Sequence, residues 1–247
     1  MIVSLLIFLF SFYWALPPQQ ASDIVRKADE KMRGNTCRAD ITITTVRPAW
    51  QRTMSVRIWS KGKDRAMIRI LQPARDKGIA YLKRGNEVWT WMPALERTIK
   101  LPPSMMSQSW MGTDFTNDDL VRESSITDDY EHSFAGDTLI DGRSCYRINM
   151  IPKPSTAVVW SRISACIDKK DFMELHMVFF DENNNPVNIM RASEVKKMDN
   201  RLIPTRFEMT PVEKTGQKTI MVYEAIAYDR PIEESFFSLS NLTTGGR

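Results

Sequence analysis

Hydrophobic and polar positions follow a helical period in the first segment after residue 21. The apolar positions of this segment recur three or four residues apart, as on one face of a helix. They are Ile24, Val25, Ala28 and Met32. The spacing predicts a helix from Asp23 to Arg33, with Ser22 as its N-cap and Gly34 as its stop.

From Asp40 onward apolar and polar residues alternate, which is typical of strands with one buried face. The alternation runs to residue 101, resumes at Asp137 and continues to residue 228. Turn chemistry interrupts it repeatedly, most clearly at Gly85-Asn86, a tight hairpin signal. The pattern predicts about eleven strands joined by short turns.

Residues 104–124 break the alternation and favour one or two short helices. Asn117 precedes two acidic residues, so we expect it to be an N-cap with those carboxylates in the first turn. A last short helix is predicted from Glu233 to Phe237.

The short connections favour antiparallel strands, because parallel crossovers need longer helical links. A sheet of this many strands must curl or close. The predicted fold is therefore mainly β: a strongly curved antiparallel sheet that forms an incomplete β-barrel with a helical lid. No linker interrupts it, so residues 22–247 are expected to be a single domain.

The first 22 residues contain no charged side chain and no histidine. Their apolar run, Ile2 to Leu16, is too short to span a bilayer and suits the core of a signal peptide. We predict a signal peptide over residues 1–21, cleaved near Ala21, and export to the periplasm. A short membrane anchor or a buried strand is the alternative. No cysteine follows closely enough to be a lipidation site, so the mature protein is expected to diffuse freely.

An exported chain with three cysteines raises the question of a disulfide. Cys145 and Cys166 flank a predicted hairpin whose turn centres on residues 152–155. In the register that places these cysteines opposite each other, like faces match on both strands. A Cys145–Cys166 disulfide is therefore possible, and two unpaired thiols are the alternative. Cys37 is read as a small hydrophobic residue.

Little in the composition points to catalysis or to nucleic acid. The net charge is +4, and no block of basic residues suits nucleic acid. Only two histidines occur, and the motifs of zinc sites, nucleophile elbows and phosphate loops are absent. We therefore expect a protein that is not an enzyme, with no cofactor and no metal, and a monomer.

Large flexible or flat apolar side chains gather in the hairpin arms and in the helical interruption. Core packing explains any one of them, but together they suit a wall and lid that part around a ligand. The predicted lipid-binding residues are Trp59, Trp89, Trp91, Met92, Met105, Met106, Trp110, Met111 and Phe115.

Arginines also alternate with aliphatic residues, at Arg57, Arg69 and Arg97. The outer face of a strand is their ordinary place. Near a cavity mouth, an arginine would instead bind a head group or the backbone of the lid.

Three stretches resemble a known family. They are residues 59–103, the motif MGTDFTNDDL at 111–120, and the closing PIEESFFSLSNL. In this order they resemble the periplasmic outer-membrane lipoprotein-sorting proteins of the LolA/LolB-like superfamily of Gram-negative bacteria. The resemblance implies an open barrel whose hydrophobic cavity holds acyl chains. It also implies a carrier that takes lipoproteins or related lipids from an inner-membrane donor complex to an outer-membrane acceptor.

Three functions are open at this point. The first is the soluble periplasmic carrier of lipoprotein acyl chains or a related lipid. The second is a periplasmic protein-binding module of an envelope transporter or a stress-sensing system, which an exposed apolar patch without a cavity would favour. The third is a hydrolase, which needs a nucleophile or a carboxylate pair inside the cavity.

Overall fold

The computed structural model describes residues 20–121, 126–154, 156 and 158–245. The predicted signal peptide therefore lies almost entirely outside the described residues. Thirteen strands are present in the described part of the chain, more than the eleven or so expected. They are β1 (Thr36–Arg47), β2 (Trp50–Lys61), β3 (Arg65–Gln72), β4 (Ala80–Arg84), β5 (Glu87–Met92), β6 (Arg97–Lys100), β7 (Tyr130–Ile140), β8 (Arg143–Pro152), β9 (Arg162–Asp168), β10 (Glu174–Phe180), β11 (Pro186–Met198), β12 (Arg201–Pro211) and β13 (Lys218–Tyr228).

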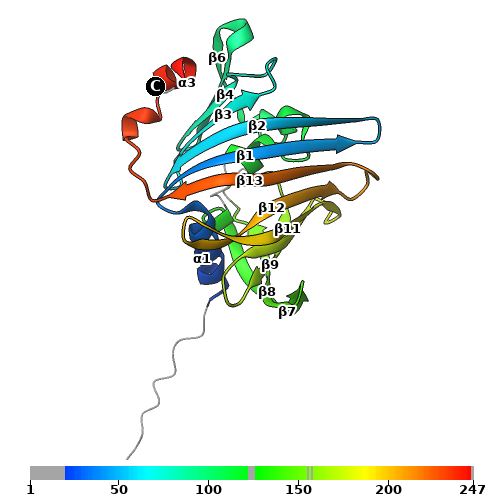
Figure 1. Ribbon diagram of the computed structural model, residues 1–247. Helices are drawn as coiled ribbons and strands as arrows, with labels where there is room; N and C mark the ends of the chain where they lie inside the picture. Colours follow the sequence, from blue (N-terminus) through cyan, green and yellow to red (C-terminus); the bar gives the residue numbers. More distant parts are fainter. Residues whose placement is uncertain (1–19, 122–125, 155, 157, 246–247) are drawn as a thin grey trace, which may run out of the picture.

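All thirteen strands belong to one sheet, and every neighbouring pair is antiparallel (Figure 1). Each strand pairs with the next in the chain, except that β6 does not pair with β7, and β1 pairs with β13 as well as with β2. The middle of the sheet is therefore built from the two ends of the chain, and its edges, β6 and β7, are formed by the middle of the chain.

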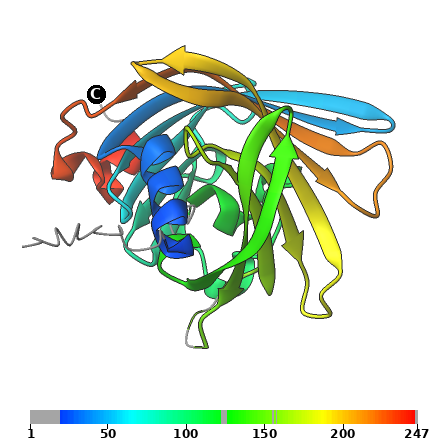
Figure 2. The same ribbon diagram turned by 90° about the horizontal axis from the view of Figure 1, so that it is seen from below.

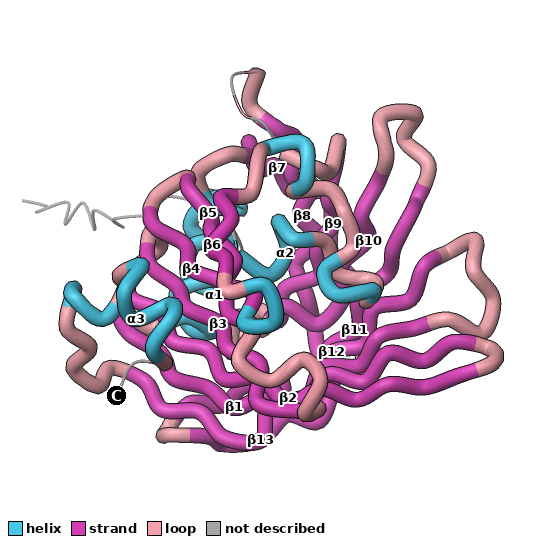
Figure 3. Tube along the Cα trace, turned by 90° about the horizontal axis from the view of Figure 1, so that it is seen from above, coloured by secondary structure: helices cyan, strands magenta, loops and turns pink. Residues whose placement is uncertain are grey.

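The connection between the two edge strands is described over residues 101–121 and 126–129. We call residues 102–121, which lie on the concave side of the sheet, the lid segment. It contains two 3₁₀ turns, η2 (Pro103–Met105) and η3 (Trp110–Gly112), and the short helix α2 (Asn117–Val121). Figures 2 and 3 show the sheet curving around this segment and around the N-terminal helix α1. The predicted curved, open barrel with a helical lid is confirmed.

Helix α1 (Ala21–Arg33) lies in the curve of the sheet because one of its faces is apolar. The buried positions follow the helical period and are Ala21, Ile24, Val25, Ala28 and Asp29. The predicted cap is wrong, since the helix begins one residue before Ser22 and Gln20, at the N-cap, forms no side-chain cap. The predicted stop is correct. Gly34 has φ of +64°, and a Cβ there would lie 3.1 Å from the Tyr228 ring.

Three elements differ from their predicted bounds. Strand β7 begins at Tyr130 rather than Asp137, because a bulge between Phe134 and Asp137 breaks the simple alternation there. The second strand of the predicted hairpin, expected soon after the turn at residues 152–155, begins only at Arg162. The last predicted helix is a 3₁₀ turn, η5 (Glu234–Phe236), followed by a helix that was not predicted, α3 (Leu239–Thr244).

The cysteine register is also corrected. Cys145 lies opposite Asp168, and Cys166 lies opposite Arg147, so the pairing is shifted by two residues from the one predicted. Such a shift keeps every side chain on its face, and hydrophobic alternation cannot detect it. All three cysteines are buried free thiols. Burial, reinforced by Asp168 and Cys166, raises the pKa of the Cys145 thiol to about 11, which keeps it protonated.

Apolar side chains pack on both faces of the sheet. Two clusters fill the concave side, one beneath the lid segment and one between α1 and strands β8 to β12. A third cluster occupies the opposite face of β2 to β5, where Phe237 and Leu242 of the C-terminal segment cover it. None of the helices in the described part of the chain combines the length and apolarity needed to cross a membrane.

Candidate functional site

A cavity of about 200 Å³ lies on the concave side, between α1, the lid segment and the sheet. At roughly 10 to 15 Å³ for each water-sized group, this space holds on the order of a dozen such groups. Most of its wall is apolar and comes from the strands β9 to β13 and from β1. The apolar wall includes Ile41, Phe115, Leu120, Tyr130, Trp160, Ile163, Met177, Phe179, Met190, Phe207, Met209, Met221 and Tyr223.

Methionines and aromatic rings give this wall its character. Met177 and Met209 are buried on it, 4% and 1% exposed, while Met190 and Met221 are partly buried. The Trp160 ring packs 5.2 Å from the Phe179 ring, measured between centroids, in a tilted arrangement. Unbranched thioether side chains adapt to irregular shapes, so the wall suits a flexible apolar guest.

One corner of the cavity is polar. It is formed by the end of α1, the turn between β2 and β3, and the end of β4. The polar and charged residues here are Asp29, Arg33, Ser60, Lys63, Arg65 and Lys83.

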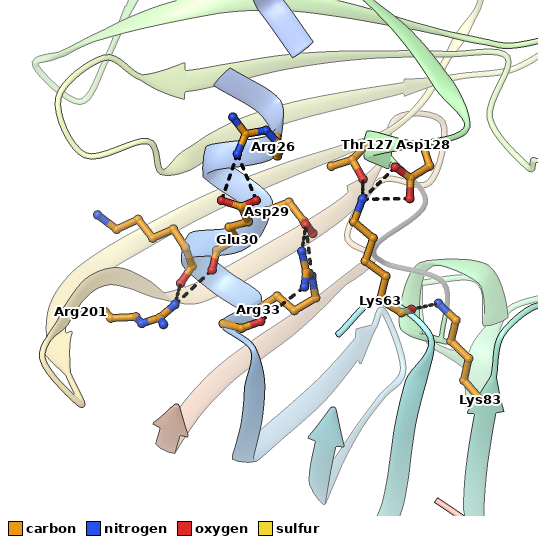
Figure 4. A network of polar contacts seen from close by, with 11 residues as sticks. Arg26, Asp29, Glu30, Arg33, Lys63, Lys83, Thr127, Asp128 and Arg201 are labelled. Atoms are coloured by element: carbon orange, nitrogen blue, oxygen red, sulfur yellow. Dashed lines mark hydrogen bonds and ion pairs between the residues drawn. The ribbon is translucent and has the colours of Figure 1, made fainter. Parts of the chain in front are cut away.

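Figure 4 shows Asp29, Arg33, Lys63 and Lys83 of this corner with their hydrogen-bond and ion-pair partners. Arg33 binds Asp29 on the next turn of α1, with 2.5 Å between Nη2 and Oδ2. Lys63 Nζ donates to Thr127 Oγ1 at 2.8 Å and to Asp128 Oδ1 at 2.8 Å, and so joins the β2–β3 turn to the chain beyond the lid segment. Lys83 Nζ donates to the Lys63 carbonyl at 2.6 Å.

Burial raises the pKa of Asp29, while Arg33 and Lys63 act in the opposite direction. This carboxylate is thus held in a largely dry site by two neighbouring cations.

Asp114 anchors the lid segment to strands β1 and β13. The Asp114 carboxylate accepts hydrogen bonds from Arg47 Nη1 at 2.9 Å, Arg47 Nη2 at 3.0 Å and Thr219 Oγ1 at 2.7 Å. Arg47 also donates to the Gly112 carbonyl, and Arg52 donates to the Met111 carbonyl. The Arg47 and Asp114 side chains are only 13% and 6% exposed, so this bidentate ion pair holds the lid segment firmly. We call it the latch.

Two residues of the motif MGTDFTNDDL cap the N-terminus of α2. The Thr116 amide donates to Asp119 Oδ2 at 2.8 Å, and the Asp119 amide donates to Thr116 Oγ1 at 3.0 Å. This is a capping box, so the cap is Thr116 and not Asn117 as predicted. Trp160 Nε1 donates to the other Asp119 oxygen at 3.0 Å, which ties the lid segment to the cavity wall. Burial raises the pKa of Asp119 against the opposing effect of these hydrogen bonds.

Of the nine predicted lipid-binding residues, Phe115 lines the cavity. Four others lie in the lid segment and pack on the neighbouring part of the concave face, in the cluster beneath it. Trp110 and Met106 are buried there, with the Trp110 ring 5.8 Å from the Tyr81 ring, and Met105 and Met111 are partly buried. These four fill space that a ligand would otherwise occupy.

The tryptophans of the hairpin arms lie on the opposite face of the sheet, which corrects their assignment to the cavity wall. Trp59, Trp89 and Trp91 pack with the C-terminal segment, and the Trp59 ring lies 5.3 Å from the Phe236 ring. Strand alternation explains this, because Ile58 faces the cavity and Trp59 must therefore face away. Met92 is half-buried and does not line the cavity.

None of the three singled-out arginines lies at the cavity. Arg57 pairs with Asp40, Arg69 donates to the carbonyls of Asn241 and Leu242, and Arg97 lies on the exposed edge strand β6. Arg47 and Arg52, which the sequence did not single out, make the arginine contacts to the lid backbone.

The sequence reasoning missed the polar corner and Trp160. A lysine inside an alternating strand was a signal for Lys83, which faces the concave side with Val88 opposite it. Among the described residues, no cluster of three or more His, Cys, Asp or Glu side chains is suited to a metal ion.

Comparisons with known proteins agree with this architecture. A family model with the description "Uncharacterized protein" matches residues 62–244, well over half of the chain. A search of curated proteins finds no match.

Three solved structures share the fold. A DUF1329 family protein from Desulfovibrio piger is 22% identical with a TM-score of 0.81, covering 90% of this chain and 97% of its own. A LolA superfamily protein from Nitrosomonas europaea is 21% identical with a TM-score of 0.78, covering 90% and 99%. A protein domain from Vibrio parahaemolyticus, described as an outer membrane lipoprotein-sorting protein, is 18% identical with a TM-score of 0.79, covering 90% and 98%.

Proposed function

The chain belongs to the family whose model matches residues 62–244 and has the fold of LolA superfamily proteins, and from this premise we propose that it is a carrier of acyl chains. The observation that carries the proposal is the apolar cavity between α1, the lid segment and the sheet. The cargo is a lipoprotein's acyl chain or that of a related lipid. The protein acts in the periplasm and transfers its cargo from an inner-membrane donor to an outer-membrane acceptor, without covalent chemistry.

The physical need for such a carrier follows from the solvation of acyl chains. Each buried methylene is worth about 0.8 kcal/mol, so a chain of about sixteen carbons costs on the order of 12 kcal/mol to expose to water. A cavity must replace most of this burial and yet release the chain. Apolar contacts with few directional bonds meet both demands, and the methionine-rich wall provides such contacts.

The lid segment and the chain beyond it are held with different firmness, and this suggests where the cargo enters. The Arg47–Asp114 ion pair, within the lid segment, is nearly buried. The Lys63–Asp128 pair, in the chain beyond the lid segment, has side chains 33% and 61% exposed. Exposed pairs contribute about 0 to 1 kcal/mol, so the mouth between α1 and Lys63 opens at a lower cost. We place the entry for the acyl chain there.

The proposal is tested by native mass spectrometry and lipid extraction of the protein purified from a Gram-negative host. We expect acyl-bearing molecules in the native protein, and binding of a fluorescent fatty acid after they are removed. A protein that carries no such molecule and binds no fatty acid would overturn the proposal and favour the docking of a protein partner.

A further inference from the structure

The cavity has two chemically distinct ends, and the distinction bears on which lipid it takes. The cations among its described lining residues are Arg33, Lys63, Arg65 and Lys83, and all four lie in the polar corner. The strands on the other side supply methionines and aromatic rings. A cavity divided in this way matches a molecule with a polar head and an apolar tail.

The sign of the charge in the corner selects among such heads. Asp29 is the carboxylate of the corner, and Asp118 lies on α2, which packs against β4. The other two lining carboxyls belong to the opposite side, since Asp119 is bound by Trp160 and Glu174 lies on β10. Among the residues that line the corner, four cations thus stand against two carboxylates. Lys63 and Arg65 also pair with Asp128 and Glu234, which do not line the cavity and whose side chains are 61% and 60% exposed, so an anionic head group can replace them.

From this arrangement we infer that the polar corner binds the head group of an anionic lipid and that the cavity therefore prefers lipids with a net negative charge. The inference rests on the proposed function and specifies its cargo. Lys83 is the central residue, because its side chain rises from β4 into the cavity, is 7% exposed and reaches the Lys63 carbonyl. Lysine ammonium and arginine guanidinium groups both bind phosphate oxygens through charge-assisted hydrogen bonds.

Lys63 gives the head group a route into the corner. Its present partner, Asp128, is 61% exposed, so a phosphate can replace that carboxylate without leaving it buried and unpaired. The exchange also releases the chain beyond the lid segment from the β2–β3 turn. Binding of the head group and opening of the mouth are thereby the same event.

The test compares two soluble lipids that have the same acyl chain and differ in net charge. Palmitoyl-lysophosphatidylglycerol is anionic, and palmitoyl-lysophosphatidylcholine is zwitterionic. We expect the delipidated protein to bind the anionic lipid about tenfold more tightly at low salt, with the preference shrinking as salt is added. Inorganic phosphate alone serves as a third ligand, and we expect it to bind far more weakly because it has no tail.

Three lysine variants assign the preference to the corner. Lys83→Met and Lys63→Met should each weaken binding of the anionic lipid more than binding of the zwitterionic lipid, and so lower the tenfold preference severalfold. Lys100→Met is the matched control, since Lys100 is 56% exposed on β6 and does not line the cavity, and the preference should persist. Near-ultraviolet circular dichroism checks folding. If Lys83→Met does not fold, the Lys63 variant decides.

The outcomes separate the two proposals. Equal affinity for both lipids in the parent protein overturns the head-group inference and leaves the carrier intact, as does a preference that persists in every folded corner variant. Binding of neither lipid contradicts the carrier itself.

Discussion

The two halves of the concave face use the same kind of sheet surface in opposite ways. Under the lid segment, the protein fills the curve with its own side chains, and Trp110 is completely buried against β4. Under α1, the wall of Met177 and its neighbours encloses the cavity. The difference teaches that apolar bulk in a lid is no sign of a ligand site. The lid segment fills its half with its own apolar side chains, and the cavity lies beside it.

The motif MGTDFTNDDL ties the lid segment to the sheet and to the cavity wall. Asp114 latches the lid segment to Arg47, Thr116 and Asp119 cap α2, and Asp119 reaches Trp160 in the hollow half. None of these contacts requires a ligand. The motif therefore fixes the position of the lid segment relative to the cavity.

The largest expected effect is the loss of stability when a buried side chain under the lid segment is truncated. Trp110→Ala removes a fully buried ring, and such truncations cost about 3 to 5 kcal/mol of stability. Urea unfolding measures the loss. Trp91→Ala, on the opposite face and half-buried, is the matched control and should cost less. Equal losses would mean that the two tryptophans are packed alike.

A smaller effect is expected from weakening the latch. Asp114→Asn keeps the shape of the side chain but removes the charge that Arg47 binds, at a cost of about 1.5 to 3 kcal/mol. Hydrogen exchange should show faster opening at the Thr113 amide, which donates to the Trp110 carbonyl, than at amides within β8. Uniform acceleration across the protein would instead indicate a global loss of stability.

The role of the half under α1 is tested by placing a large side chain in its cavity. Ala39 is 2% exposed and lines the cavity from β1, so Ala39→Phe places a ring in the ligand space. We expect the affinity for a fluorescent fatty acid to fall about tenfold or more, with stability changed by less than about 1.5 kcal/mol. Trp91→Phe is the control on the opposite face and should bind as the parent does. A loss in the control but not in Ala39→Phe would return the binding site to the tryptophan face.

The smallest effect concerns the pH dependence of Asp119. Its folded-state pKa is raised by burial, so its contribution to stability is fully present below the unfolded pKa and is lost as the pH rises through the folded value. Relative to Asp119→Asn, the parent should therefore gain stability as the pH falls from neutral into the acidic range. Urea unfolding at several pH values measures the difference, and a difference independent of pH contradicts the assignment.

The sequence was sufficient to predict the sheet but not to identify which of its two faces is concave. Alternation in β2 and β5 puts Ile58 and Val88 on one side and Trp59 and Trp89 on the other, and both sides carry apolar residues. Both are apolar because both are covered, one by the lid segment and the other by the C-terminal segment. Only the long-range packing of Phe237 and Leu242 identifies the tryptophan side as the outer one.

The remaining misses have similarly long-range causes. The hairpin of Cys145 and Cys166 differs from its predicted register by two residues, and this leaves the hydrophobic pattern unchanged. The corner of Lys63 and Lys83 forms where a turn, a strand and the end of α1 meet, and no local pattern brings these together. Periodicity predicts which residues share a face of one element, whereas a site between elements depends on how the elements pack.

The central claim is that an acyl chain lies in the half under α1 and not in the half under the lid segment. Methyl NMR of ¹³C-methionine protein, titrated with a spin-labelled stearic acid, tests it directly, because methionines lie in both halves. We predict that the methyl signals of Met177, Met190, Met209 and Met221 broaden first, while those of Met54 and Met67, in the sheet core, stay sharp. Broadening that begins at Met105 and Met106, with the cavity methionines unaffected, would contradict the account.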